Sequence, residues 1–319
     1  MININRLGLG CMGMNRRNAE KSIRTIHYAL DKGITLFNTG EFYQAGESEI
    51  VVGEALKGVP RDKYFISVKY GVLPKLEAGR YSLYGLDVNP FNVKAHVTYS
   101  LTRLGIDYID LYEPARMDLA IPVEDIIGEL SNLVREGYIR HIGLTQIDEK
   151  TLKRANKVHQ IHTVELLYSL ADRAYEKGMF QTAHELGIKV LAFGALSHGL
   201  LNDSILTNSS KSSIPIGIFA PENLSDNLKL VRDLKAIADK HNTNIATLAL
   251  AWTFSKYPYI STLVGTTSPE HLQDSIDALS IELNKEDIEE IENAFPAEKV
   301  KGTGMGDFIC RNGKLVNFD

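Results

Sequence analysis

A tyrosine and a lysine close two apolar segments near the start of the chain. Tyr43 ends ITLFNTGEFY (34–43), and Lys69 ends YFISVK (64–69). An ammonium group near a phenol favours the phenolate and lowers the phenol pKa, so such a tyrosine can serve as a general acid. The pair suits proton delivery to a carbonyl oxygen. Spacing alone leaves an alternative, in which Tyr43 is a surface loop residue and Lys69 a solvated strand end.

Other polar side chains follow apolar segments in the same way. If those segments are parallel barrel strands, their C-terminal ends meet at one mouth. The side chains expected to converge there are Asn38, Tyr43, Lys69, Glu113, Arg116, Gln146 and Glu165. Among the nine histidines only His198 is placed near this mouth, in a capping or solvated role. The histidines form no pair with metal-ligand spacing, and two cysteines make no metal knuckle, so no metal site is predicted.

Short apolar segments alternate with amphipathic ones along the whole chain, which is typical of repeated βα units. The strand candidates are 6–11, 34–39, 64–69, 108–113, 140–145, 162–168, 189–194 and 260–266. Segments such as 19–33, 122–137 and 227–242 have apolar residues at helical spacing. Eight strands, each followed by a helix, predict a closed (β/α)8 TIM barrel, an α/β fold in one domain, 1–319.

Two connections are too long to be simple turns. Residues 73–90 follow the third strand candidate and residues 201–225 the seventh. In a barrel both lie on the C-terminal face, where long connections form lids or walls. The first carries Tyr84, which is either a substrate contact or a loop anchor. The tail, 295–319, is a candidate cover for the same face.

Composition argues against several classes of partner. A hydrophobic content of 44% with 24% charged residues is ordinary for a globular protein. The net charge of −5 and the lack of a dense Lys/Arg tract argue against nucleic acid. No segment resembles a membrane span or a signal peptide, so we expect a cytoplasmic protein. No dinucleotide fingerprint GxGxxG opens a helix after the first strand, which argues against a Rossmann unit.

The chain resembles the aldo-keto reductase family from nearly end to end. The matching stretches are LGLGCMGM, ITLFNTGEFY, GESEIVVGEAL, RDKYFISVKYG, SLTRLGIDYIDLYEPARMD, GELSNLVREGYIRHIGLTQ, ELLYSLADR, GIKVLAFGALSHGLL, LALAWTFS and VGTTSPEHLQDSIDAL. The resemblance implies a TIM barrel that reduces a small carbonyl substrate with NADPH, NADH being the alternative. Hydride passes from nicotinamide to the carbonyl carbon in that family while a tyrosine protonates the oxygen. Tyr43 matches the proton donor and Lys69 its partner.

The same resemblance assigns residues to the cofactor and the substrate. Phe193 matches the ring that stacks on nicotinamide, and GALSHGLL (194–201) the segment whose N–H groups meet the pyrophosphate. Thr267 and Ser268 replace a Lys-Arg pair that binds the 2′-phosphate of NADPH in many relatives. The implied cofactor residues are Met12, Asn38, Thr145, Gln146, Glu165, Phe193, Gly194, Leu196, Gly199, Gly265, Thr267, Ser268, His271 and Asp274, and the implied substrate residues are Glu113, Arg116 and Tyr84.

Two positions depart from the family pattern. Asn38 stands where the family has an aspartate, and Ala115 stands where it usually has a histidine. Without the carboxylate we expect Lys69 to be less firmly ionised if it is buried. Loss of a donor to the carbonyl oxygen typically costs about a hundred- to a thousandfold in rate. Arg116, Glu113 or a water are the candidates for compensation.

These departures leave two hypotheses about function. The ARMD segment (115–118), the GEFY loop (40–43) and Glu165 are similar to the branch that includes pyridoxal reductases, which implies pyridoxal or another small aldehyde as substrate. The alternative is a nicotinamide-binding sensor or interaction protein with weak or no catalysis, because both Asn38 and Ala115 are replacements. The sequence predicts no oligomeric state.

Overall fold

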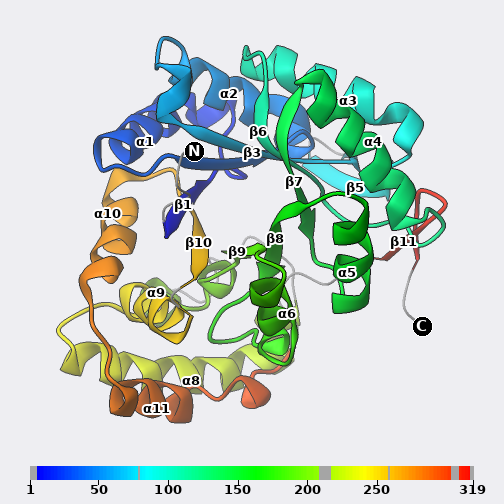
Figure 1. Ribbon diagram of the computed structural model, residues 1–319. Coiled ribbons are helices and arrows are strands. Elements are labelled where there is room, and N and C mark those ends of the chain that lie inside the picture. The colour runs from blue at the N-terminus through cyan, green and yellow to red at the C-terminus, as the bar shows by residue number, and fades with distance from the viewer. Residues whose placement is uncertain (1–5, 78–79, 208–216, 258, 303–308, 317–319) are drawn as a thin grey trace.

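The computed structural model describes residues 6–77, 80–207, 217–257, 259–302 and 309–316. Its central feature is a closed barrel of parallel strands in the order β1-β10-β9-β8-β7-β6-β3-β2 (Figure 1). The strands are β1 (Leu7–Gly10), β2 (Leu36–Gly40), β3 (Phe65–Tyr70), β6 (Ile109–Pro114), β7 (Ile139–Thr145), β8 (Ile161–Leu167), β9 (Lys189–Phe193) and β10 (Ile260–Gly265). The predicted TIM barrel is confirmed, with each predicted strand close to its expected bounds.

Helices surround this barrel (Figure 1). They are α1 (Ala19–Asp31), α2 (Glu47–Leu56), α3 (Pro90–Leu104), α4 (Val123–Glu136), α5 (Glu149–Val158), α6 (Met179–Glu185), α7 (Ser204–Thr207), α8 (Pro221–Lys240), α9 (Ile245–Lys256), α10 (Pro269–Asp277) and α11 (Lys285–Ala294). Local signals fix their ends: α4 has Glu124 and Asp125 in its first turn, where the helix dipole favours negative charge. It ends at Gly137, whose φ of 86° suits a glycine.

The barrel interior changes from apolar to polar along the strands. Its lower layer is a separate apolar cluster made of Leu36, Phe65, Leu111, Leu191 and Leu263. Side chains on a strand alternate between its two faces, so the next inward positions after Phe65 on β3 are Ser67 and Lys69. The polar positions therefore lie toward the C-terminal ends of the strands, above an apolar floor.

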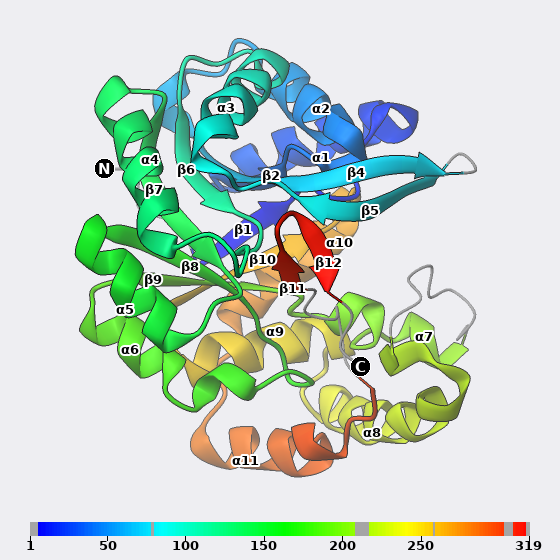
Figure 2. The same cartoon turned by 90° about the vertical axis from the view of Figure 1, so that its right-hand side faces the viewer.

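A second, antiparallel sheet lies beside the barrel, in the order β11-β12-β5-β4 (Figure 2). It consists of β4 (Val72–Glu77), β5 (Arg80–Leu86), β11 (Ile309–Arg311) and β12 (Lys314–Val316). The connection at 73–90, predicted as a long loop, is thus largely a hairpin that projects from the barrel. Residues 78–79 of it lie outside the described residues, as do 208–216 of the predicted connection at 201–225.

The C-terminal tail is held against this hairpin and against the connection that follows β6. Lys314 pairs with Gly85 of β5, and the backbone N–H of Leu119 donates to the Cys310 carbonyl at 2.9 Å. The carboxylate of Asp118 accepts hydrogen bonds from the backbone N–H groups of Asn312 and Gly313. Because these partners follow the C-terminal ends of β3 and β6, the described part of the tail lies on the predicted side of the barrel. Residues 303–308 and 317–319 lie outside the described residues.

Two histidines close the opposite, N-terminal end of the barrel. The rings of His141 on β7 and His162 on β8 stack with centroids 4.2 Å apart, and the Phe65 ring lies 6.3 Å from that of His162. Burial, helped by nearby positive charges, lowers the pKa of His162 to about 4, and burial also lowers the pKa of His141. Both rings are therefore neutral at pH 7.

We expect this stack to destabilise the fold in acid. The pKa of His162 is lower in the folded chain than its ordinary value of 6.5, so the unfolded chain binds more protons as pH falls from 6.5 toward 4. Replacing the ring by His162→Gln should reduce the loss of unfolding free energy between pH 7 and pH 5 by on the order of 1 kcal/mol. Denaturant titrations at both pH values measure this loss. An equal loss in wild type and variant contradicts the expectation.

Candidate active site

Five side chains form what we call the buried polar layer of the barrel: Asn38 of β2, Ser67 and Lys69 of β3, Glu113 of β6 and Glu165 of β8. None is more than 4% exposed. Asn38 pairs in register with Ser67, and Lys69 with Glu113. Since β2 and β8 lie on opposite sides of the strand order, the layer crosses the barrel interior.

An ion pair lies at the centre of the buried polar layer. The Lys69 ammonium donates to Glu165 Oε1 at 2.9 Å and to Asn38 Oδ1 at 2.5 Å. The Asn38 amide in turn donates to Glu165 Oε2 at 2.8 Å. Burial alone would lower the pKa of Lys69, but the acidic groups around it, Glu165 foremost, outweigh burial together and the pKa is raised. The predicted weaker ionisation of Lys69 is therefore wrong, because Glu165 supplies the charge that Asn38 lacks.

Glu113 is the second carboxyl group in the layer. Ser67 Oγ donates to its Oε1 at 3.1 Å, and the side chain has no exposed surface. Burial and the neighbouring Glu165 raise the pKa of Glu113 well above its ordinary value, which favours the neutral acid. The predicted contact between Glu113 and substrate stays a prediction.

The structure brings Tyr43 to this layer. Lys69 Nζ lies 5.5 Å from the centroid of the Tyr43 ring, which is partly exposed. A Cβ on Gly40 would lie 3.3 Å from the Lys69 carbonyl oxygen and 3.4 Å from Tyr43 Cδ1, so the glycine permits this close approach. Lys69 is thus not a solvated strand end. Lys69 lowers the pKa of Tyr43, as expected, but burial outweighs it, so the pKa is raised and the phenol is protonated at neutral pH.

Contacts of Glu41 fix the loop that carries Tyr43. Its backbone N–H donates to the Lys69 carbonyl at 2.9 Å, and its Oε1 accepts from the Gly71 N–H at 2.7 Å. His96 on α3 places Nδ1 2.9 Å from the same oxygen and Nε2 3.5 Å from an Asp87 oxygen. Burial alone would lower the pKa of His96, but the two carboxylates raise it. Sequence analysis included Glu41 only as part of the GEFY loop and missed His96, because no local signal links the two residues.

Ala115, which replaces the family's histidine, and two predicted substrate residues have different surroundings. Ala115 is buried, and its backbone N–H donates to the Tyr70 carbonyl at 2.9 Å. Arg116 is 8% exposed and donates from Nη1 to the Ala115 carbonyl at 2.6 Å. Tyr84 lies on β5 and is 52% exposed. The hairpin thus keeps Tyr84 in solvent, and its predicted substrate role is not tested.

Predicted nicotinamide residues lie together at the C-terminal ends of β7, β8 and β9. Thr145 pairs in register with Glu165, and Leu167 pairs with Phe193. Gln146 Oε1 accepts the Leu167 N–H at 2.7 Å. Thr145 Oγ1 is buried, and among the described residues it has no hydrogen-bond partner.

The segment 194–201 forms a tight turn after β9. Gly194 and Gly199 have φ values of 68° and 100°, and His198 has 56°. Within the turn the N–H of Ser197 donates to the Gly194 carbonyl and that of Gly199 to the Leu196 carbonyl, at 2.7 and 2.9 Å. The His198 ring is partly buried, burial lowers its pKa, and its Nε2 has no partner in the part of the chain that the structure describes. The expected capping or solvated role therefore does not describe this ring nitrogen.

The segment predicted to bind the 2′-phosphate of the cofactor lies beside the first strand. Gly10 of β1 pairs with Gly265 of β10, and a Cβ on Gly13 would lie 4.0 Å from Thr267 Cγ2. Ser268 precedes α10 and donates from Oγ to Glu270. The remaining predicted cofactor residues at this edge are Met12, in the connection after β1, and His271 and Asp274, both on α10. This edge of the predicted cofactor site is therefore formed by the connection after β1 and by the segment from β10 to α10, which lie far apart in the sequence.

A family model described as "Aldo/keto reductase family" matches residues 6–295. The chain belongs to the aldo/keto reductase family. It is 34% identical over 309 residues to the probable aldo-keto reductase 1 of Glycine max, covering 94% of this chain and 88% of that protein. A glycerol dehydrogenase from Gluconobacter oxydans has a TM-score of 0.81 at 26% identity, covering 93% of this chain and 94% of its own. A Klebsiella pneumoniae aldo/keto reductase in complex with NADP and acetate shares the fold, with a TM-score of 0.71, 24% identity and 92% of each chain covered.

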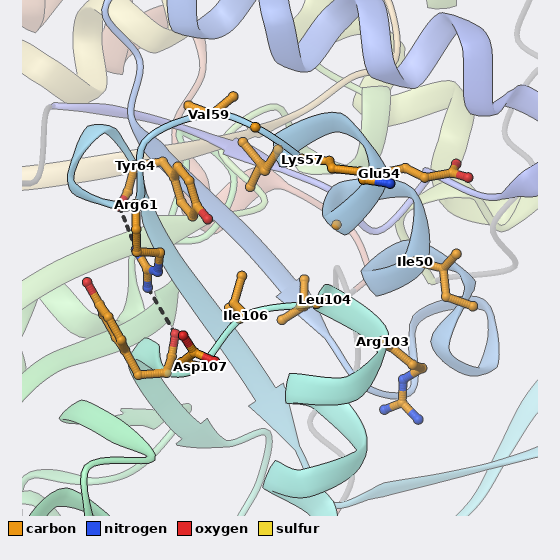
Figure 3. A pocket seen from close by; sticks show the side chains of 15 residues that line it. Ile50, Glu54, Lys57, Val59, Arg61, Tyr64, Arg103, Leu104, Ile106 and Asp107 are labelled. Carbon is orange, nitrogen blue, oxygen red and sulfur yellow. Dashed lines mark hydrogen bonds between the residues drawn. The ribbon is translucent and has the colours of Figure 1, made fainter.

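One cavity of this aldo/keto reductase lies away from the predicted site. It has a volume of about 530 Å³ and is lined by α2, the end of α3 and the segments before β3 and β6 (Figure 3). Its Arg61 guanidinium carbon lies 4.7 and 4.0 Å from the ring centroids of Tyr64 and Tyr108. The lining contains no predicted site residue and lies at the N-terminal end of the barrel, where side chains serve stability.

Two further properties concern the described residues only. Among them, no helix is long and apolar enough to cross a membrane. The same residues include no group of three or more His, Cys, Asp or Glu side chains that could hold a metal ion.

We expect Glu41→Gln to loosen the loop that carries Tyr43. Loss of the charged partner of His96 should lower the free energy of unfolding by about 1–3 kcal/mol. The His96 pKa is raised in the folded state, so its contribution is present below pH 6.5 and is lost as pH rises through the folded pKa. Denaturant titrations should therefore show a larger difference from wild type at pH 6 than at pH 9.

The matched control for this prediction is Glu47→Gln. Glu47 lies near the same loop, and its carboxylate accepts an exposed hydrogen bond from the Arg16 N–H at 3.2 Å. This variant should change the free energy of unfolding by less than about 0.5 kcal/mol. If the two variants lose equal stability at pH 6, the contacts of Glu41 do not hold the loop.

Proposed function

We propose that this protein reduces the carbonyl group of a small aldehyde to an alcohol, with NADPH as cofactor and NADH as the alternative. The observation that carries the proposal is the buried ammonium of Lys69 beside the partly exposed phenol of Tyr43. Membership of the aldo/keto reductase family supports the same reaction. Pyridoxal is the first substrate to test, on the basis of the ARMD segment, the GEFY loop and Glu165.

The residues at the predicted cofactor positions fit a polar ligand. Buried polar atoms in proteins nearly always have hydrogen-bond partners. Thr145 Oγ1 and His198 Nε2 are buried atoms for which the described residues offer none. They lie at the positions that the family resemblance assigns to the carboxamide and the pyrophosphate. The N-terminus of α10, with Thr267 and Ser268, is suited to a phosphate group.

The cofactor would supply a hydride to the carbonyl carbon, and the protein would supply a proton to the carbonyl oxygen. Tyr43 is the donor in this proposal, since its raised pKa keeps it protonated at neutral pH. When its O–H bond breaks, the negative charge that remains on the phenolate oxygen is stabilised by the Lys69 ammonium. Ala115 supplies no donor to the same oxygen, so we expect a slower reaction than in relatives that have the histidine.

The sensor hypothesis has lost part of its support. It rested on the replacements at Asn38 and Ala115, and the first leaves Lys69 paired with a carboxylate from Glu165. The replacement at Ala115 still favours weak catalysis, because alanine offers no donor to the carbonyl oxygen. Measured turnover therefore has to distinguish a slow reductase from a protein that only binds the cofactor.

We expect Tyr43→Phe to abolish turnover without abolishing cofactor binding. The variant removes the proton donor, and a general acid contributes about a hundred- to ten-thousandfold to a rate. NADPH consumption with pyridoxal and with an activated aromatic aldehyde measures turnover, and NADPH fluorescence measures binding. Tyr99→Phe is the matched control, since Tyr99 lies on α3 with 60% of its surface exposed.

Three outcomes separate the hypotheses. Turnover in wild type and in Tyr99→Phe that collapses in Tyr43→Phe supports the reductase and its acid. Tight NADPH binding without turnover in any of the proteins favours the sensor. Equal turnover in wild type and Tyr43→Phe contradicts the assignment of the proton donor.

A further inference from the structure

We propose that Glu165 is the positioning residue that holds Lys69 charged and in place, so that the lysine's carboxylate partner has moved from β2 to β8. The inference rests on the proposed function, because it concerns the lysine that supports Tyr43. The family resemblance implies an aspartate at position 38. Here position 38 carries an amide, and the carboxylate faces Lys69 from Glu165 on β8 instead.

The hydrogen bonds among Lys69, Glu165 and Asn38 are those expected when position 165 carries the carboxylate and position 38 the amide. Both Glu165 oxygens accept from Lys69 Nζ, at 2.9 and 3.1 Å. Asn38 uses its oxygen toward Lys69 and its nitrogen toward Glu165. An amide can accept from the ammonium and donate to the carboxylate at once, whereas an ionised carboxylate can only accept. An aspartate at position 38 would instead place a second negative charge against Glu165.

Other ionisable groups of the described residues also lie close to Lys69, and two of them, Tyr43 and Glu113, contribute to its raised pKa. The groups around it are Glu165 from β8, Glu113 from β6, Tyr43 from the loop after β2 and Cys11 from the connection after β1. Burial raises the pKa of Glu113 and of Tyr43, and it raises the pKa of the Cys11 thiol to about 12. These shifts favour the neutral form of all three groups. Glu165 is the group whose two oxygens both accept from Lys69 Nζ, so the inference assigns the negative charge to Glu165.

A buried ammonium without a carboxylate tends to lose its proton, because burial disfavours the charged form. Removal of the Glu165 charge should therefore discharge Lys69 within the working pH range. The phenolate that forms on Tyr43 would then lack its stabilising cation. The effect should fall on kcat, since Lys69 and Tyr43 act on the transition state rather than on substrate binding.

The test compares Glu165→Gln, Asn38→Asp/Glu165→Gln and wild type. The ammonium signal of Lys69, in nitrogen-15 NMR of full-length protein and assigned by its loss in Lys69→Met, reports the lysine charge without turnover. In Glu165→Gln we expect this signal to disappear at a lower pH than in wild type, and kcat at pH 7 to fall by roughly a hundredfold with little change in KM. The double variant restores one carboxylate and one amide and should recover both properties.

Glu113→Gln is the control for the NMR signal, because it removes a neutral acid next to the same lysine. It should leave the pH at which the Lys69 signal disappears close to that of wild type. A Glu165→Gln protein that unfolds while the double variant folds and recovers the signal also supports the proposal.

Three results overturn the inference. They are an unchanged Lys69 signal and kcat in Glu165→Gln, a double variant that folds without recovery, and a double variant that does not fold. Absence of turnover in wild type would sink the proposed reductase while the NMR comparison still decides the role of Glu165.

Discussion

The ion pair between Lys69 and Glu165 is the constraint on which the site depends. A charge can be buried in a protein interior only if it is paired and hydrogen-bonded, and removal of one partner of such a pair is strongly destabilising. The two residues are 96 positions apart in the sequence and meet only because the barrel closes. The alternation of side chains along β3 then sets Lys69 above an apolar floor rather than in solvent. Closure of the barrel therefore brings the ion pair together, and the ion pair allows the charge of Lys69 to be buried inside the barrel.

The loop after β2 holds the phenol ring of Tyr43 in place relative to Lys69. Gly40 lets the chain pass close to Lys69, and Glu41 ties the loop to the backbone after β3 and to His96. Tyr43 follows two residues later. Its ring is thus fixed relative to the ammonium by contacts that are largely buried, which is the kind of support that a proton donor needs to stay within reach of a reacting oxygen.

Much of this arrangement could be predicted from the sequence, since strand periodicity is local and parallel strand ends must meet. The barrel and the approach of Tyr43 to Lys69 followed from those rules. The charge state of Lys69 did not, because no local signal shows that the side chain at 165 reaches across to 69. The hairpin at 73–90 was missed although β4 and β5 pair with each other over a short connection, because the segment was interpreted from its length alone. Apart from this hairpin, the sequence was insufficient where contacts join distant segments.

The most direct test of this account is a crystal structure of the protein with bound NADPH. We expect Lys69 Nζ to stay within about 3.2 Å of a Glu165 oxygen while the cofactor is bound, with Asn38 between them. We also expect Thr145 Oγ1 and His198 Nε2 to gain polar partners. A structure in which Glu165 turns away from Lys69 and leaves it with neutral partners only would contradict the account.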